Sequence, residues 1–412
     1  MTQKIGDVAT LRQAWARYTE AGEECRLLLE DTDRFRNHPE LRSQAYATLA
    51  EAQAMAYNFA VQPVVNGVNG DYPEAGWHTT WHHNLYHLGQ SVQDFQYGGL
   101  FLDGRKTYRM TGRIGNARLL LLQVHNHLNG HPASEEIGNY DFHQAFELGD
   151  DGSFDVILSA TPHTGNWIEL SAESDHNALI MRRILGDWND DRGEMHVQII
   201  DQPADLEPMG DDPIASALFL AADFMVYLTK VFTVGLYDTY IGWANGQKNA
   251  WAAMPGANVA TELIGSRSTT YCSAIWELES DEALIIEGEV PDSAYWGFQL
   301  GDVWSRPLDF IHHQTDLNMQ RATLCADGRV RAVLALKDPG IPNWLDPCGN
   351  DQGTLVFRNY RSTRPTNPPL LTKVKLADLM DHLPSDTPRI TPDERAAALA
   401  YRRSGVMRMM GH

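Results

Sequence analysis

The chain has 412 residues, which is long enough for two or three domains and a sizeable core. Its 43% apolar and 21% charged residues are typical of a soluble globular protein. The formal net charge of −21 argues against nucleic acid or an anionic membrane as a partner, because both attract basic surfaces.

Cysteine usage and the N-terminal segment indicate the compartment. The four cysteines are widely spaced and include no Cys-x-x-Cys pair, which predicts neither a disulfide framework nor a structural zinc site. The N-terminal residues contain no apolar signal core. We therefore expect a cytoplasmic protein.

The N-terminal region, residues 1–100, is predicted to be helical. Segments 11–30 and 40–60 are rich in Ala, Leu, Glu and Arg, with apolar residues at three- and four-residue spacing. Residues 77–95 place aromatic and aliphatic side chains at a period close to 3.6, so we expect an amphipathic helix there as well.

Residues 101–205 are predicted to form a first β-unit. Short apolar runs alternate with turn residues, which is typical of an antiparallel sandwich or barrel. The predicted strands cover residues 106–114, 117–124, 153–160, 178–185 and 194–200.

Residues 206–255 read as an apolar helical connector. Its core, 213–237, is nearly long enough to span a bilayer, but Asp223 and Lys230 interrupt it, and an Asp-Pro pair supplies a helix start. We expect a helix buried in the protein core or in a homo-oligomer interface, and no membrane partner.

Residues 256–380 are predicted to form a second β-sandwich, followed by a C-terminal tail helix within 381–412. The predicted strands cover residues 268–278, 282–290, 295–304, 319–326, 330–336 and 353–360.

The two β-units contain an internal similarity. Residues 151–183 and 327–359 each open with Asp-Gly, continue into an apolar strand, reach an Asn-Trp pair and close with a strand that ends in Arg. This pattern predicts two β-units of common design, paired about an approximate two-fold axis. The expected class is α+β and mainly β: N-terminal helices, then two related antiparallel sandwiches separated by a long apolar helix.

The second copy resembles a known family. "YWGFQLGDVW" (295–304) and "DGRVRAVLALKDPGIPNWLDPCGNDQGTLVFRNY" (327–360) are similar to domain-of-unknown-function family 1214, over roughly 265–365. Residues 100–205 loosely resemble its N-terminal companion, family 1254. The usual Asn-Trp-Leu-Pro of the family is Asn-Trp-Leu-Asp here. The resemblance implies a jelly-roll-like β-sandwich and implies no particular reaction.

Histidines supply the first candidate sites. His78/His82 and His83/His87 have helical i, i+4 spacing but lie on different helix faces, so they do not form one four-ligand site. On a strand, His125 and His127 would project from one face, as in metal-binding jelly rolls of the cupin kind. A divalent metal ion is the cofactor that this pair could hold; otherwise it is a strand-end pair facing water or the neighbouring unit.

The segment 302–320 is the best candidate active site, because a long polar loop on a rigid sandwich is where catalysis commonly resides. His312 or His313 beside Asp316 could form a base and its orienting acid. The alternative is a structured loop with ordinary ion pairs. The expected catalytic residues are His312, His313, Asp316, Asp302 and Arg306, and the expected substrate-binding residues are Asn318, Trp304, Trp296 and Tyr295.

The Asn-Trp pairs read as scaffold. Catalytic residues are rarely duplicated with a fold, so we expect each Trp to close one end of a sandwich and each Asn to cap a turn. The closing arginines, Arg182 and Arg358, are expected to stack on these tryptophans or to pair with an acid. No Gly-x-Ser-x-Gly elbow, P-loop or dinucleotide fingerprint is present in the sequence.

Three functions fit these features. The first is a hydrolase or lyase that uses general acid–base chemistry, with or without a metal, on a small lipophilic molecule. The second is a non-catalytic ligand-binding or assembly protein. The third is a metal-dependent, cupin-like oxygenase or isomerase, which rests on His125 and His127.

Overall fold

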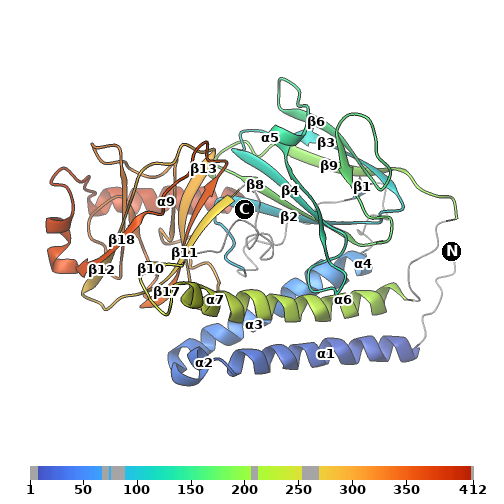
Figure 1. Cartoon of the computed structure of the whole chain (residues 1–412), viewed down its shortest axis with the longest axis horizontal. Coiled ribbons are helices and arrows are strands. Elements are labelled where there is room, and N and C mark those ends of the chain that lie inside the picture. The colour runs from blue at the N-terminus through green and yellow to red at the C-terminus, as the bar shows by residue number, and fades with distance from the viewer. Residues whose placement is uncertain (1–7, 67–73, 76–88, 206–211, 253–268, 410–412) are drawn as a thin grey trace. The chain divides into compact units, whose positions relative to one another are not determined.

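The computed structural model describes residues 8–66, 74–75, 89–205, 212–252 and 269–409, and it divides into two compact units (Figure 1). Unit 1 comprises most of the described chain up to Val234. Unit 2 comprises the described residues from Gly235 onward, together with residues 89–95 and 184–190. Each unit is mostly β-sheet and unit 1 carries the N-terminal helices, which confirms the predicted mainly β, α+β class.

Helices of unit 1 pack on one another beside its sheets. The central helix, α6, begins where the Asp212 side chain accepts hydrogen bonds from the N–H groups of Ile214 (2.9 Å) and Ala215 (3.1 Å), with Pro213 in the first turn. It lies against α1 (Figure 1). The unit contains α1 (Val8–Glu30), α2 (Asp33–Asn37), α3 (Arg42–Ala56), α4 (Gln62–Asn66), α5 (Phe142–Ala145) and α6 (Pro213–Leu228), with a π-helical turn at Tyr57–Val61.

The apolar helix is mostly buried, as predicted. Among the described residues, Pro213–Trp243 is long and apolar enough to cross a membrane, but 67% of its most apolar window is buried inside the protein, as in the core helix of a soluble protein. Two of its charged residues pair with α1. Arg17 Nη2 donates to Asp223 Oδ1 at 3.2 Å, and Lys230 Nζ donates to Glu24 Oε1 at 3.0 Å.

The strands of unit 1 form two sheets. One has the order β1-β9-β3-β6-β7 and the other β2-β8-β4-β5. Pairing is antiparallel apart from the short parallel contact of β6 with β7. The strands are β1 (Glu74–Ala75), β2 (Phe95–Leu102), β3 (Thr107–Arg113), β4 (Leu119–His125), β5 (Glu136–Asp141), β6 (Ser153–Ser159), β7 (Trp167–Glu169), β8 (Asn177–Ile184) and β9 (Glu194–Asp201).

Unit 2 repeats this arrangement. Its sheets have the orders β10-β11-β17-β13-β14 and β16-β15-β12-β18, with one parallel contact, β15 with β16. The strands are β10 (Ala250–Trp251), β11 (Thr269–Glu277), β12 (Glu282–Gly288), β13 (Tyr295–Gly301), β14 (Asp316–Asn318), β15 (Val330–Ala335), β16 (Trp344–Leu345), β17 (Gln352–Tyr360) and β18 (Leu370–Lys375). The helices are α7 (Leu236–Trp243), which follows a π-helical turn at Thr229–Gly235, a 3-10 turn at Leu376–His382, and α9 (Pro392–Met409).

Strands β2–β9 map in order onto β11–β18, and the mapped strands have the same neighbours in their sheets apart from the added edge strands β1 and β10. The Asp-Gly turns also match, because Gly152 and Gly328 have φ of 76° and 77°, a conformation that favours glycine. In both turns the preceding Asp accepts a hydrogen bond at 3.0 Å from the N–H two residues on, Ser153 in one and Arg329 in the other. The predicted duplication is therefore confirmed in topology and in turn geometry.

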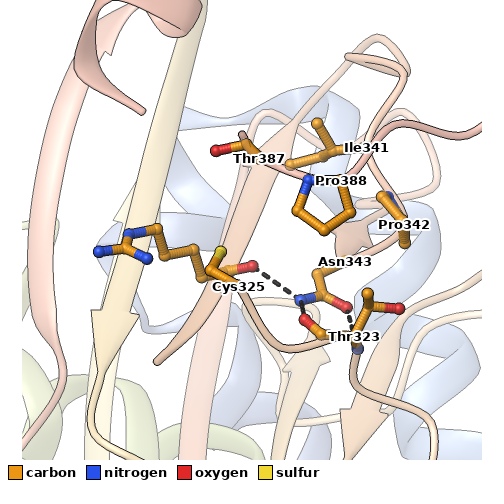
Figure 2. Close-up of a pocket in the computed structure, with 8 residues that line it drawn as sticks. Thr323, Cys325, Ile341, Pro342, Asn343, Thr387 and Pro388 are labelled. Atoms are coloured by element: carbon orange, nitrogen blue, oxygen red, sulfur yellow. Dashed lines mark hydrogen bonds between the residues drawn. The ribbon is translucent and has the colours of Figure 1, made fainter. Parts of the chain in front are cut away.

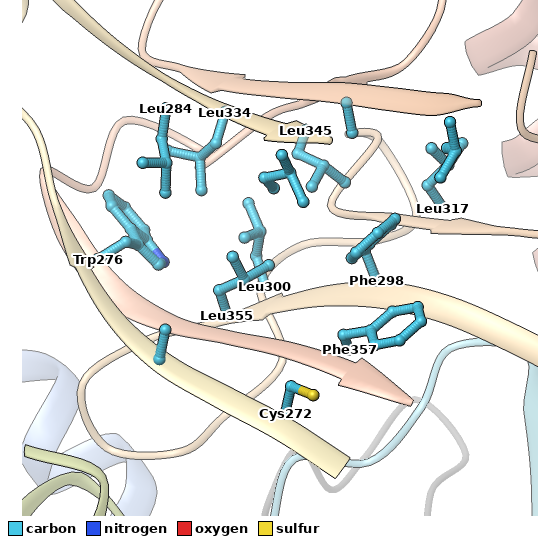
Figure 3. Close-up of a cluster of buried hydrophobic side chains, with 14 of the residues drawn as sticks. Cys272, Trp276, Leu284, Phe298, Leu300, Leu317, Leu334, Leu345, Leu355 and Phe357 are labelled. Atoms are coloured by element: carbon cyan, nitrogen blue, oxygen red, sulfur yellow. The ribbon is translucent and has the colours of Figure 1, made fainter. Parts of the chain in front are cut away.

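The core of unit 2 lies between its two sheets. Trp276 of β11, Phe298 of β13 and Leu355 of β17 face Leu284 of β12 and Leu334 of β15 (Figure 3). These side chains are at most 2% exposed. Burial of large side chains of this kind contributes about 1.5–3 kcal/mol each relative to exposure, so the sandwich is a rigid base for its loops.

Two predicted elements differ from the structure. Within the predicted helix 77–95, residues 76–88 lie outside the described part, 89–94 form turns, and Phe95 begins β2. The predicted strand 319–326 is a turn, because strand pairing occurs earlier, at Asp316–Asn318. Its apolar residues follow the buried strand β14, which contains Asp316, and they do not form a strand of their own.

Candidate functional site

The segment 302–315 has a topological counterpart in unit 1. It connects β13 to β14, and residues 126–135 connect the equivalent strands β4 and β5. The first connection contains His312 and His313, and the second contains His127 and His131. The duplicated fold therefore places a histidine-bearing loop at the same corner of both units.

The start of the 302–315 loop is built from buried residues. Asp302 is 5% exposed, and its Oδ1 accepts hydrogen bonds from the N–H groups of Trp304 at 2.8 Å and Arg306 at 2.9 Å. Trp304 is fully buried, and Trp296 of β13 is part of the sandwich core. Asp302 therefore caps a turn, and the two tryptophans expected to bind substrate are core residues.

Contrary to our expectation, Asp316 does not orient either histidine. It is 2% exposed, and Arg321 and Arg402 of α9 both donate to its carboxylate, Arg402 Nη1 at 2.6 Å. Arg402 also donates to the carbonyl of Phe310 at 2.9 Å, and both guanidinium groups lie over the ring of Trp188. Asp316 thus ties the C-terminal helix to the loop.

A second buried acid completes this charged network. Asp94 Oδ1 pairs with Arg321 at 2.7 Å, and its Oδ2 accepts from the Tyr295 hydroxyl at 2.8 Å and from Asn318 Nδ2 at 2.9 Å. Burial raises the pKa of Asp94, with Arg321 opposing the shift, and burial also raises the pKa of Tyr295. Tyr295 and Asn318, which we expected to bind substrate, are enclosed in a network whose charges already have partners.

The two histidines of the loop are paired with other acids. His312 is exposed, and its Nδ1 lies 2.9 Å from Asp309 Oδ2. Partial burial works to raise the pKa of Asp309, but hydrogen bonds from the side chain and backbone of His312 lower it below its ordinary value. His313 Nδ1 lies 2.8 Å from Asp346 Oδ2, with 41% of the His313 side chain and 14% of the Asp346 side chain exposed.

Cys348 lies beside the His313–Asp346 pair. One donor atom from each of the three side chains falls within 4.8 Å of the other two, the one such group in the described part of the chain. The N–H of Cys348 donates to Asp346 Oδ1 at 2.9 Å. Burial raises the pKa of the Cys348 thiol to about 12, and the charges of Asp346 and Asp309 contribute to the shift.

Sequence reasoning missed Asp346 and Cys348 because they belong to the Asn-Trp turn that we assigned to the scaffold. The available signal was that the sequence departs here from the family pattern and from its own first copy. The family's Asn-Trp-Leu-Pro is Asn-Trp-Leu-Asp here, and the first copy has no cysteine after its Trp. The fold then brings this turn, residues 346–351, to the His313 loop, since Asp346 N–H donates to the Gln314 carbonyl at 2.9 Å.

The expected metal pair of unit 1 does not share a strand face. Strand β4 ends at His125, and His127 lies in the bend that follows, so the two-residue alternation no longer applies. His125 is 4% exposed, and burial, then Arg182, lowers its pKa to about 4. His127 Nδ1 instead contacts Ser174 Oγ at 3.2 Å, and its ring stacks on that of His131. The four histidines at 78–87 lie outside the described residues.

The Asn-Trp turns behave as scaffold in both copies. Asn343 bridges the N–H and carbonyl of Thr323, and Trp344 Nε1 donates to the Ala335 carbonyl at 2.8 Å. Asn166 bridges the same two groups of Glu147, and Trp167 Nε1 donates to the Ser159 carbonyl at 3.1 Å.

The closing arginines do not stack on these tryptophans. Arg182 and Arg358 each donate to a glutamine 59 positions earlier, Gln123 and Gln299. The guanidinium over Trp344 is that of Arg395.

A hollow lies beside Asn343 (Figure 2). Its free volume is about 10 Å³, roughly the space that a single water molecule needs and far below that of common ligand pockets. Thr323, Ile341 and Pro388 line it, and Asn343 is hydrogen-bonded to Thr323 inside it. It is therefore part of the turn scaffold and does not define a substrate site.

Comparison with known proteins gives a family for one unit. Residues 94–186 match the family described as "Protein of unknown function (DUF1214)". No curated protein matches the chain.

A solved structure shares the fold. An uncharacterised protein from Burkholderia cenocepacia is similar over 90% of this chain and 99% of its own, with 28% identity and a TM-score of 0.77. The VPA0106 protein from Vibrio parahaemolyticus aligns over 79% of this chain and 96% of its own, with 10% identity and a TM-score of 0.48.

The family that we recognised matches, but at another position than we expected. The match covers residues 94–186, most of the first β-unit, whereas we placed family 1214 at 265–365 and family 1254 at 100–205. The family 1254 expectation is not confirmed. Because the two units repeat the same turns and strands, these motifs alone could match the family to either unit. The sequence "NWLDP" led us to place the family at the second unit.

Proposed function

We propose that this protein, whose residues 94–186 belong to the DUF1214 family, is a hydrolase or lyase that acts on a small molecule by general acid–base chemistry. His313 would exchange the proton with substrate, and Asp346 would orient its ring. Trp296 and Trp304 are core residues, so they no longer argue for a lipophilic substrate.

The observation that carries this proposal is the 2.8 Å contact between His313 Nδ1 and Asp346 Oδ2. A carboxylate at Nδ1 holds the proton on that nitrogen and leaves Nε2 as the acceptor, which is the arrangement of a general base and its orienter. His313 Nε2 has no hydrogen-bond partner among the described residues, and the side chain is 41% exposed, so substrate can reach it.

Acid–base chemistry is favoured over thiol chemistry at this corner. The Cys348 thiol has a pKa raised to about 12, so it is protonated at neutral pH and a poor nucleophile. His312 is paired with Asp309 in a similar way, but more than half of its side chain is exposed. The His313–Asp346 pair is less exposed and therefore held more firmly, so it is the better candidate for the general base and its orienting acid.

The test is a substrate panel assayed in the presence of a chelator. Small esters, lactones, amides and hydroxy acids are offered to the wild type and to Asp346→Asn and His313→Ala. We expect each variant to lose activity by about 10²–10⁴-fold, the usual contribution of general acid–base catalysis. The amide of Asp346→Asn keeps an oxygen for the Cys348 N–H, so the turn is retained.

Matched controls are His312→Ala and Asp309→Asn, which alter the neighbouring pair and should leave activity unchanged. For Asp346→Asn, the pH profile of kcat/KM should also change, since the carboxylate acts through His313. Full activity in His313→Ala would overturn the proposal.

A further inference from the structure

We propose that His313, Asp346 and Cys348 form a binding site for one divalent transition-metal ion of the zinc type. The inference rests on the donor set and its geometry, and it stands or falls separately from the proposed acid–base function. A bound ion would occupy His313, so metal binding and proton transfer by that ring exclude one another.

The distances fit a small cation with little rearrangement. The donor atoms lie within 4.8 Å of one another, and His313 Nδ1 and Asp346 Oδ2 are 2.8 Å apart. Two ligands on one tetrahedral zinc ion stand about 3.3 Å apart, given bond lengths of about 2.0–2.3 Å. His313 Nδ1 and Asp346 Oδ2 must therefore separate by about 0.5 Å, and the Cys348 sulfur must approach them by at most about 1.5 Å.

The donor chemistry selects the class of ion. An imidazole nitrogen, a carboxylate oxygen and a thiol sulfur together suit zinc and neighbouring transition metals, whereas calcium and magnesium prefer oxygen ligands alone. Three protein ligands leave the fourth tetrahedral position for water, as in open zinc sites. His313 and Asp346 are partly exposed, so an ion can enter from solvent.

The backbone holds the three donors in place. The two loops are joined by the Asp346 N–H to Gln314 carbonyl bond (2.9 Å), and the Gln314 side chain donates to the carbonyls of Pro342 (2.8 Å) and Trp344 (2.6 Å). Cys348 has a φ of 54°, in the left-handed region, and its N–H is fixed to Asp346 Oδ1. Ligands supported in this way lose little conformational entropy on binding.

The local charge favours a cation. The backbone carbonyls of Asp309 and Asp346 lie 3.9 Å and 3.8 Å from Cys348 Sγ, so two acidic residues border the site. His312 is already paired with Asp309. A divalent ion would offset the two carboxylates and deprotonate the thiol on binding.

Cobalt(II) is the probe that reports the sulfur ligand directly. Metal-free protein is titrated with Co²⁺, and we expect thiolate-to-cobalt charge-transfer absorption in the near ultraviolet that saturates at one equivalent and is displaced by Zn²⁺. Cys348→Ser should abolish this absorption. Cys325→Ser removes another cysteine of unit 2 and should leave it unchanged.

Calorimetric titration with Zn²⁺ gives the second readout. His313→Ala, a change at a partly exposed residue, should weaken binding by at least about tenfold, because loss of even an outer-shell partner costs 10–100-fold. Absence of the absorption at one equivalent, or its persistence in Cys348→Ser, would overturn the metal site. Activity in chelator-treated protein tests the proposed function separately, so failure of one leaves the other intact.

Discussion

The corner after β4 in unit 1 and the corner after β13 in unit 2 occupy the same position in a duplicated fold, yet they carry different chemistry. In unit 1, His127 contacts a neutral serine, Ser174, and stacks on His131. In unit 2, His313 contacts a carboxylate, Asp346, beside a thiol. The scaffold is shared, and among the described residues the group of histidine, carboxylate and thiol is found in unit 2.

The shared features explain why the scaffold tolerates this divergence. Each unit has the Asp-Gly turn, the Asn-Trp turn, and an arginine bonded to a glutamine 59 positions earlier. The bonds of the Asn and Trp side chains and of the Arg–Gln pair are made within each sandwich and do not use the histidine side chains. The loops can therefore change without loss of the fold.

The largest expected difference between the units is in how much equivalent residues of β5 and β14 contribute to the free energy of unfolding. Asp316 lies opposite Gln299 on the neighbouring strand, and Asn139 lies opposite the equivalent Gln123. Asp316 differs in that it accepts hydrogen bonds from two buried arginines. Asp316→Asn should lower the free energy of unfolding by about 3–5 kcal/mol, because it leaves a buried cation without its partner. Asn139→Ala should cost about 0.5–1.5 kcal/mol. Equal losses in urea unfolding would show that the buried network does not stabilise unit 2.

The pH dependence of stability should depend on His125, whose counterpart in unit 2 is Gly301. Burial lowers the pKa of His125 from 6.5 to about 4, so the unfolded state binds the proton more readily in this window. The free energy of unfolding should therefore fall by up to about 3 kcal/mol as the pH drops from 6.5 to 4. His125→Leu should remove this slope; an unchanged slope would mean that other groups cause it.

A smaller difference is expected between the two Asn-Trp turns. Asn343 is 4% exposed, whereas Asn166 is only partly buried, so water can replace the lost bonds more easily at Asn166. Asn343→Ala should cost about 1–3 kcal/mol, and Asn166→Ala at the lower end of about 0.5–1.5 kcal/mol. Thermal unfolding of both variants decides this; a larger loss at Asn166 would contradict the burial argument.

Much of the fold could be predicted from sequence because its signals are local. Alternating apolar runs gave most strands, the Asp-Pro pair gave the start of α6, and repeated Asp-Gly and Asn-Trp pairs gave the duplication. Strand β2 and the short or edge strands were missed: β1, β5, β7, β10, β14, β16 and β18. Their pairing is decided by neighbours far along the chain, and not by their own composition.

The site could be predicted only in part. The segment containing His312 and His313 was predicted to be a polar loop between two strands, as the structure has it, but the acid partners of the histidines were misassigned. Asp316 is three residues from His313 in sequence, yet its side chain is buried against Arg402 of α9. Asp346 is 33 residues away and is brought to His313 by a loop contact that no local pattern encodes.

The most direct test of the central claim compares the twin histidines in one assay. With a substrate found in the panel, kcat/KM is measured for wild type, His313→Ala and His127→Ala in chelator-treated protein. A loss of about 10²–10⁴-fold in His313→Ala alone is the expected result. Equal losses in both variants, or a loss in His127→Ala alone, would contradict the assignment of the chemistry to unit 2.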